Sequence, residues 1–159
     1  CGLWEFPGGK REPGESLAQA LAREALACCR SWGARLLLNA EPELALALGA
    51  DGAHLNSRRL ALIQARPLPA DRWVAASCHN AEELARAQAL GLDFALLSPV
   101  RATDSHPGAM ALGWERFRSL VDPAALPVYA LGGMQRSDLE LAQQAGGQGI
   151  AAIGALWGR

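Results

Sequence analysis

Three glycines in the last part of the chain stand where main-chain N–H groups could bind a phosphate. Gly132 and Gly133 follow an apolar run at residues 127–131, and Gly154 follows a second run at residues 149–153. Glycine allows a positive φ and lets a ligand approach the backbone closely. A phosphate site is one interpretation of these strand ends. The other is a pair of ordinary tight turns, because a double glycine by itself is a weak signal.

The elements around these glycines form one unit. Residues 126–156 contain two short apolar strands with an amphipathic helix between them. Such a βαβ unit has parallel strands, which must be covered on both faces. In many parallel βα barrels the loops after the last two strands bind phosphate. The unit therefore predicts an α/β fold with its chemistry at the carboxyl ends of the strands.

Polar residues also follow other predicted strands. Asn39 ends a short apolar strand, at the edge where a barrel binds its ligand. Asn80 precedes a helical segment and, with the glutamate three residues later, has the pattern of a capping box. His54 and Cys78 are interpreted as structural residues, since Cys78 has no evident base beside it in the sequence.

Composition narrows the classes of function. The chain has 159 residues, half of them hydrophobic, and a net charge of −1. These values predict one domain and a small-molecule ligand rather than nucleic acid or a membrane surface. The four cysteines form no C-x-x-C pair, and no apolar run approaches the roughly 18 residues of a membrane span. We therefore expect a soluble protein of the reducing cytoplasm.

The stretch from Ala34 to Leu156 resembles the family of βα barrels that contains thiamine phosphate synthase and TenI. "YALGGM" and "GGQGIAAIGAL" stand where that family has its two phosphate-binding strand ends, and "GADGAHL" is similar to its "GADGVHL" segment. The resemblance implies a parallel TIM-type (β/α) barrel that binds small phosphorylated substrates.

The resemblance also assigns roles to individual residues. The implied phosphate-binding residues are Gly132, Gly133, Gly154, Ser77, Thr103, Ser105 and His106. The implied substrate-binding residues are Asn39 and His79. His106 stands where the family has a lysine, and a histidine is mostly neutral at pH 7 unless an anion raises its pKa. Phosphate binding is therefore expected to depend on pH.

The synthase family uses Mg²⁺, but its metal ligands are largely absent here. The synthases carry two aspartates that hold the ion, and Ala40 and Arg59 occupy those positions. A cation at a ligand position removes a carboxylate and repels Mg²⁺. The tautomerase histidine of TenI is replaced by Pro99. The resemblance implies Mg²⁺ as the cofactor, but these signatures assign no metal ligand and no catalytic residue in this chain.

The first 30 residues resemble the start of a Nudix box of the MutT type. The matching residues are Gly9, Glu15, Arg23 and Glu24, spaced G-x5-E-x7-R-E. Ala27 and Cys28 stand where the box needs two further glutamates for Mg²⁺. The alternative is that the segment is structural, with Leu17, Ala20, Leu21 and Leu26 packed against the sheet. The expected division is residues 1–30 for this segment and 31–159 for the barrel.

The predicted barrel is incomplete. Its strands are expected around Trp4, Leu37, Ala53, Ala75, Ala95, Tyr129 and Ala151. A complete barrel has eight strands and usually more than about 200 residues. Two strand edges would stay exposed, which favours a homodimer. The chain is interpreted as a fragment or internal deletion of a bifunctional parent, or as an assembly artefact, and the sequence does not distinguish these origins.

Two functions follow from these features. One is a thiamine phosphate synthase or TenI-like protein of thiamine biosynthesis that binds a phosphorylated thiazole or pyrimidine, with weak or lost synthase activity. The other is a non-catalytic phosphate-ligand binding or regulatory domain of a MutT-like Nudix pyrophosphohydrolase.

Overall fold

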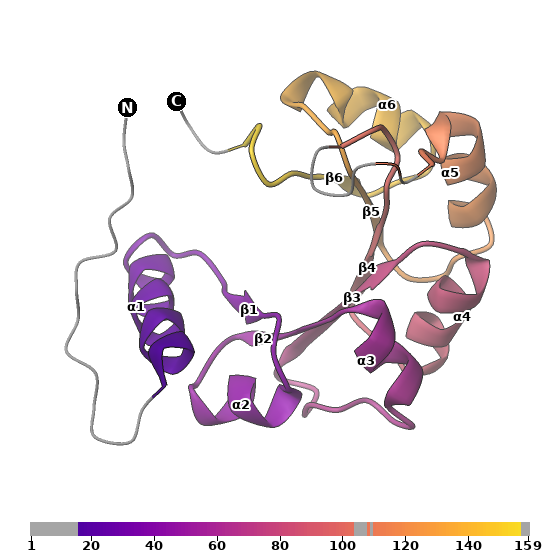
Figure 1. The fold of residues 1–159 in the computed structure, drawn as a ribbon. Coiled ribbons are helices and arrows are strands. Elements are labelled where there is room, and N and C mark those ends of the chain that lie inside the picture. The colour runs from indigo at the N-terminus through magenta and orange to yellow at the C-terminus, as the bar shows by residue number, and fades with distance from the viewer. Residues whose placement is uncertain (1–15, 104–107, 109, 157–159) are drawn as a thin grey trace.

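The computed structural model describes residues 16–103, 108 and 110–156. Within these residues six parallel strands form one sheet in the order of the sequence (Figure 1). The strands are β1 Leu37–Leu38, β2 Gly52–Leu55, β3 Trp73–Cys78, β4 Phe94–Leu97, β5 Val128–Leu131 and β6 Gly149–Ala151. They coincide with six of the predicted strands. The seventh, around Trp4, lies outside the described residues.

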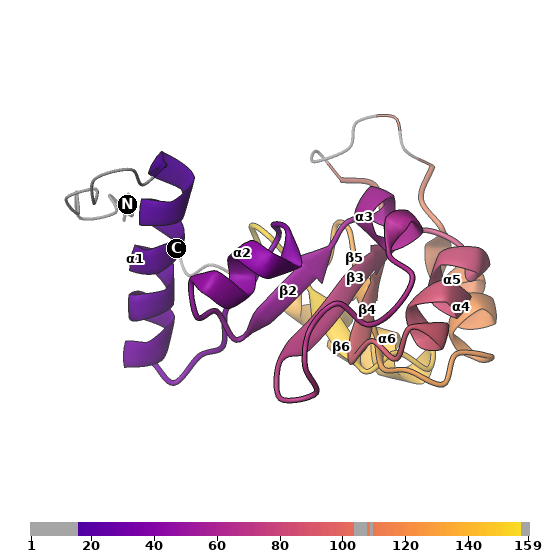
Figure 2. The same ribbon diagram turned by 90° about the horizontal axis from the view of Figure 1, so that it is seen from below.

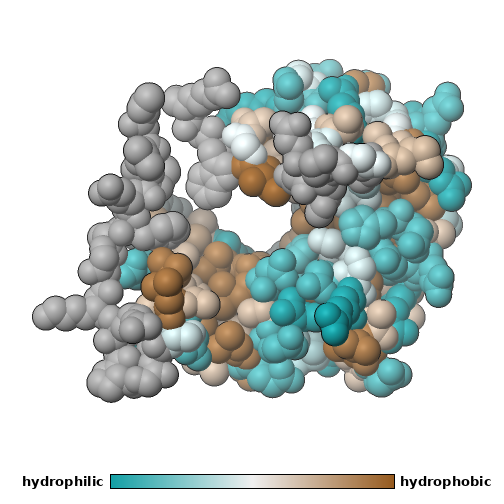
Figure 3. Space-filling model, viewed as in Figure 1, coloured by the Kyte–Doolittle hydropathy of each residue, from teal (hydrophilic) through white to brown (hydrophobic). Residues whose placement is uncertain are grey.

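Helices follow most strands and cover the outer face of the curved sheet (Figure 1). They are α1 Leu17–Ser31, α2 Pro42–Ala47, α3 Ser57–Leu62, α4 Ala81–Ala89, α5 Gly113–Val121, the 3₁₀ helix η1 Arg136–Asp138 and α6 Leu139–Gln144. The space-filling view shows that the molecule is hollowed at its centre, on the inner side of the sheet (Figure 3). The predicted parallel α/β architecture is confirmed.

The core lies between the sheet and its outer helices. Ala95 and Leu97 of β4 are fully buried, whereas Phe94 and Leu96, which alternate with them, are half-buried. This alternation follows because successive side chains of a strand point to opposite faces. Phe117 of α5 and Leu60 of α3 complete the buried outer layer.

An aromatic row crosses the amino-terminal part of the sheet. The ring centroids of Trp73 and Phe94 are 5.9 Å apart, and those of Phe94 and Tyr129 are 5.6 Å apart. Both pairs meet edge to face, the favourable arrangement of two ring quadrupoles. The guanidinium of Arg35 lies 5.5 Å from the Trp73 ring. These side chains fill the end of the inner face that is opposite the carboxyl ends of the strands.

Helix α1 lies beside α2 at the β1 end of the sheet, as Figures 1 and 2 show from two sides. Ser16 and Gln19 form its capping box. Ala20 and Leu26 are buried, but Leu17 and Leu21 are 63% and 40% exposed. The expectation that all four apolar residues pack inward was therefore wrong for Leu17 and Leu21. The neighbouring strand β1 has only two residues, so this end of the sheet offers too little surface to cover the whole apolar face of α1.

Asn80 caps α4 as predicted. Its side-chain oxygen accepts a hydrogen bond from the N–H of Glu83 at 2.9 Å. The carboxylate of Glu83 accepts from the N–H of His79 at 2.6 Å, one residue before the expected partner. Across the described part of the chain, no helix has the length and apolar character to cross a bilayer.

Candidate ligand-binding pocket

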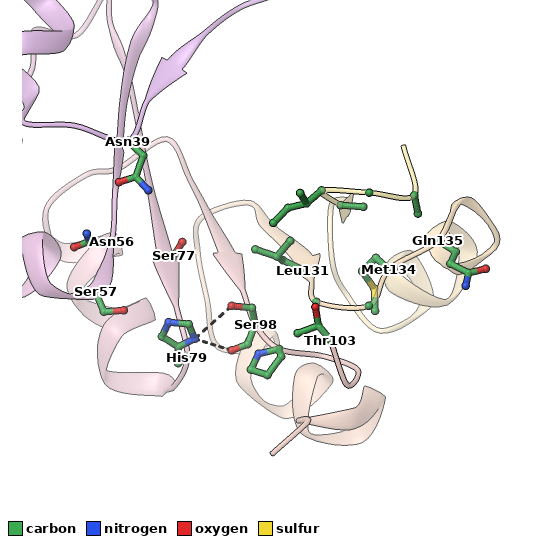
Figure 4. Close-up of a pocket in the computed structure, with 17 residues that line it drawn as sticks. Asn39, Asn56, Ser57, Ser77, His79, Ser98, Thr103, Leu131, Met134 and Gln135 are labelled. Atoms are coloured by element: carbon green, nitrogen blue, oxygen red, sulfur yellow. Dashed lines mark hydrogen bonds between the residues drawn. The ribbon is translucent and has the colours of Figure 1, made fainter. Parts of the chain in front are cut away.

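A cavity of about 550 Å³ opens at the carboxyl ends of the strands. It is lined by seven of the residues predicted to bind ligand, namely Asn39, Ser77, His79, Thr103, Gly132, Gly133 and Gly154. They come from segments that are distant in the sequence. They meet here because parallel strands bring all their carboxyl ends to one edge of the sheet. In Figure 4, Asn39 and Ser77 lie on one side of the cavity, and Thr103 lies on the other.

The turn after β5 needs glycine at two positions. Gly132 has φ +97° and Gly133 has φ +65°. A Cβ at Gly132 would lie 2.8 Å from Pro99 Cα, and a Cβ at Gly133 would lie 2.5 Å from the Ala102 carbonyl oxygen. The turn is therefore packed tightly against the segment that follows β4.

Hydrogen bonds join the same two segments. The N–H of Val100 donates to the carbonyl of Leu131 at 2.9 Å, and the N–H of Arg101 donates to that of Gly132 at 3.1 Å. Tight packing of the turn is therefore enough to explain why both positions need glycine, whether or not a ligand binds there. Gly154 differs, because a Cβ there would meet nothing within 4 Å.

His79 has a defined hydrogen-bond partner at the pocket. Its Nδ1 lies 2.8 Å from the carbonyl oxygen of Ser98 (Figure 4). A carbonyl only accepts, so Nδ1 is the donor and carries the proton. In the neutral ring Nε2 is then left as an acceptor. His79 can accordingly accept a hydrogen bond from a ligand hydroxyl or amino group.

His54 supports Ser77 from the neighbouring strand. Its Nε2 lies 2.8 Å from Ser77 Oγ. Burial lowers the pKa of His54, because desolvation penalises the charged ring. The neutral ring orients a hydroxyl that lines the cavity. This geometry agrees with the interpretation of His54 as a hydrogen-bonded strand residue.

Cys78 is fully buried on the outer side of β3. Burial, and secondarily the charge of Glu83, raise the pKa of its thiol to about 12. The thiolate is the reactive form of cysteine. Cys78 therefore serves packing, as the sequence indicated.

Arg59 lines a second, smaller pocket that adjoins the cavity at Asn56. Its Nε donates to Glu41 Oε1 at 2.9 Å, and one terminal nitrogen donates to Asn39 Oδ1 at 3.0 Å. Asn56 caps α3 by accepting from the N–H of Arg59 at 2.9 Å. Both asparagines line the cavity. The sequence did not identify Arg59 as a site residue.

A second ion pair lies near the glycine turn. Arg101 Nη2 lies 2.8 Å from Asp138 Oδ1, and Asp138 is buried. Its carboxylate also accepts from the N–H of Gln135 at 2.9 Å. The carboxylate of Asp138 is buried, whereas 45% of the Arg101 side chain is exposed. Their short contact compensates the charge of Arg101.

Several residues that line the cavity were not predicted from the sequence. They are Asn56, Ser57, Ser98 and Gln135. Each is polar and stands shortly after an apolar strand, which is the signal that could have identified them. The predicted residues Ser105, His106, Gly9 and Glu15 lie outside the described residues. Arg23 and Glu24 lie on α1 and do not line the cavity.

The fold and the position of the cavity define a parallel βα protein of the barrel type with a small-molecule pocket at the strand ends. Solved structures agree with this fold. A thiamine phosphate pyrophosphorylase from Pyrococcus furiosus superposes with a TM-score of 0.66 at 22% identity, covering 89% of this chain and 69% of its own. A structure of a FabK mutant from Thermotoga maritima superposes with a TM-score of 0.60 at 12% identity, covering 84% and 48%.

Sequence comparison is more specific. The family model described as thiamine monophosphate synthase matches residues 10–156. A thiamine-phosphate synthase of Thermosynechococcus vestitus is 36% identical over 85% of this chain and 39% of its own length. A putative thiamine-phosphate synthase 2 of Aquifex aeolicus is 34% identical over 84% and 72%. The chain belongs to the thiamine monophosphate synthase family, and it spans about two fifths of the first relative's length.

Proposed function

We propose that this chain binds a phosphorylated thiazole or pyrimidine of thiamine biosynthesis and has weak or no synthase activity. The observation that carries the proposal is the cavity in which seven predicted ligand-binding residues meet. Its volume of about 550 Å³ suits a small ligand. A metabolic ligand of this kind also supports a cytoplasmic location.

The chemistry of the lining favours binding over catalysis. The synthase reaction requires stabilisation of a departing pyrophosphate, the role that preorganised cations and donors fill. The described lining residues supply hydroxyls such as those of Ser77 and Thr103, but include no aspartate, glutamate, lysine or arginine. Neutral donors can hold a phosphate. They stabilise the extra charge of the transition state less than charged groups do.

Calorimetry with thiazole phosphate tests the proposal. We expect saturable binding, and no formation of thiamine phosphate when the pyrimidine diphosphate is added. Rapid product formation would make the chain a working synthase. Absence of binding with and without Mg²⁺ would overturn the proposal.

The alternative proposal is a regulatory or phosphate-ligand binding domain of a MutT-like Nudix pyrophosphohydrolase, with the boundary between segment and barrel at residues 30 and 31. It rests on the spacing of Arg23 and Glu24 on α1. The family model begins at residue 10 and so overlaps this segment. An assay of nucleoside triphosphate cleavage separates the two proposals.

A further inference from the structure

The described residues do not fit a magnesium site at the β1 and β2 ends of the pocket. Mg²⁺ is held by carboxylate and water oxygens in octahedral geometry. The described part of the chain contains no cluster of three or more histidine, cysteine, aspartate or glutamate side chains that could hold an ion. The guanidinium of Arg59 lies between Asn39 and Glu41, the two oxygen-bearing side chains that follow β1.

Local structure fixes the position of this guanidinium. Asn56 caps α3, which makes Arg59 the third residue of the helix. Side chains of a helix lean toward its amino terminus, so Arg59 points to the edge where the strands end. Arg58, one residue earlier, is exposed and lines the same second pocket. Arg59, rather than Arg58, donates to Asn39 of the cavity lining.

Arg59 keeps unused donors. A guanidinium has five N–H groups, and the bonds to Glu41 and Asn39 use two of them. Within the described residues the other three have no acceptor. Glu41 compensates the charge only weakly, because 68% of its side chain is exposed and water screens the pair. Arg59 thus offers charge and donors to an anion, whereas Arg101 is compensated by a buried carboxylate.

We propose that the guanidinium of Arg59 takes the place of a divalent cation where the second pocket adjoins the cavity, so that a diphosphate or phosphate monoester binds to this chain without Mg²⁺. The inference deepens the proposed function and rests on it. It predicts a metal-independent site in which Arg59 contacts the anion, and in which Asn39 is held by the same side chain.

The test measures the affinity of inorganic pyrophosphate by calorimetry, in EDTA and in Mg²⁺, for the full chain and for four variants. We expect the unmodified chain to bind equally well in both buffers. Arg59→Ala should lose about tenfold to a hundredfold in affinity in EDTA, the value of a charge-assisted hydrogen bond. Arg116→Ala removes an exposed arginine of α5 that lines neither pocket, and this control should bind like the unmodified chain.

The other two variants separate binding from a structural role. Glu41→Gln should bind pyrophosphate about twofold to fivefold more tightly, because it frees Arg59 from an exposed ion pair. A purely structural Arg59 would instead make this variant weaker or unchanged. Arg59→Asp should bind pyrophosphate only when Mg²⁺ is present, and its circular dichroism spectrum reports whether it folds.

Each outcome decides the inference. Binding by the unmodified chain only in Mg²⁺, or equal losses in Arg59→Ala and Arg116→Ala, would overturn the role of Arg59 and leave the proposed function intact. Absence of pyrophosphate binding in both buffers, combined with absence of thiazole phosphate binding, would overturn both. If Arg59→Ala does not fold, the affinity of Glu41→Gln decides between the two roles of Arg59, because that substitution alters an exposed side chain and should leave the fold intact.

Discussion

The Nε2 atom of His54 lies 2.8 Å from the Oγ of Ser77, across the pair formed by β2 and β3. A buried, neutral ring thus holds a hydroxyl that lines the pocket. Because the folded protein disfavours the charged ring, the unfolded chain binds a proton on His54 more readily. Folding stability is therefore linked to the protonation of this residue.

The first prediction concerns pH and stability. The contribution of His54 is fully present above its unfolded pKa of about 6.5 and is lost as the pH falls below that value. Urea unfolding at several pH values should show the free energy of unfolding decreasing from about pH 7 to pH 5. In His54→Gln this decrease should be smaller. Parallel curves for the two proteins would contradict the prediction.

The second prediction concerns the glycine turn. In Gly133→Val a Cβ would be forced to within 2.5 Å of the Ala102 carbonyl, at a φ of +65°. We expect at least about tenfold weaker binding of thiazole phosphate, because strain of about 1–3 kcal/mol displaces both segments. Helix content should stay nearly unchanged in circular dichroism. Gly154→Ala is a steric control for folding, and unaltered affinity in Gly133→Val would remove the phosphate assignment.

The third prediction concerns the amino-terminal segment. Ala27 and Cys28 stand where a Nudix box needs carboxylates, so we expect no Mg²⁺-dependent cleavage of nucleoside triphosphates. Phosphate release from a set of nucleotides measures this directly. Hydrolysis that disappears in Glu24→Gln would support the Nudix alternative instead.

The fourth prediction concerns thiol reactivity. With a pKa of about 12, Cys78 is almost entirely protonated at pH 8. Iodoacetamide followed by peptide mass spectrometry should modify the exposed Cys28 in the native protein and Cys78 only after denaturation. Equal modification rates for these two thiols in the native state would show that β3 opens readily.

The fifth prediction concerns association. Among the described strands, β1 pairs only with β2, and β6 pairs only with β5. Unpaired parallel edges gain hydrogen bonds when two chains meet. We therefore expect dimers or larger species in sedimentation velocity, with a fraction that grows with concentration. A monomer over the whole concentration range would mean that the edges are covered within one chain.

The secondary structure was largely predictable from the sequence. Six strands and the Asn80 cap were correctly placed, since apolar runs and capping patterns are local signals. The resemblance also identified seven residues that the fold brings to one cavity. Their common location follows from the parallel topology alone.

Contacts between distant residues were not predictable in this way. The bonds of Arg59 to Asn39 and of His54 to Ser77 join residues about twenty positions apart, and they depend on the register of neighbouring strands. The exposure of Leu17 and Leu21 was also unforeseen. A helical pattern shows which face is apolar, but it does not show how much surface is available to cover that face.

The strand order has a consequence for synthesis of the chain. Among residues 16–103 and 110–156, each strand hydrogen-bonds only to the strands before and after it in the sequence. The first strands can therefore pair before the last ones have left the ribosome, and each new βα unit docks on an edge that already exists. The pocket is completed last, since the turns after β5 and β6 form its final wall. Ligand binding can thus begin only when translation of this region has ended.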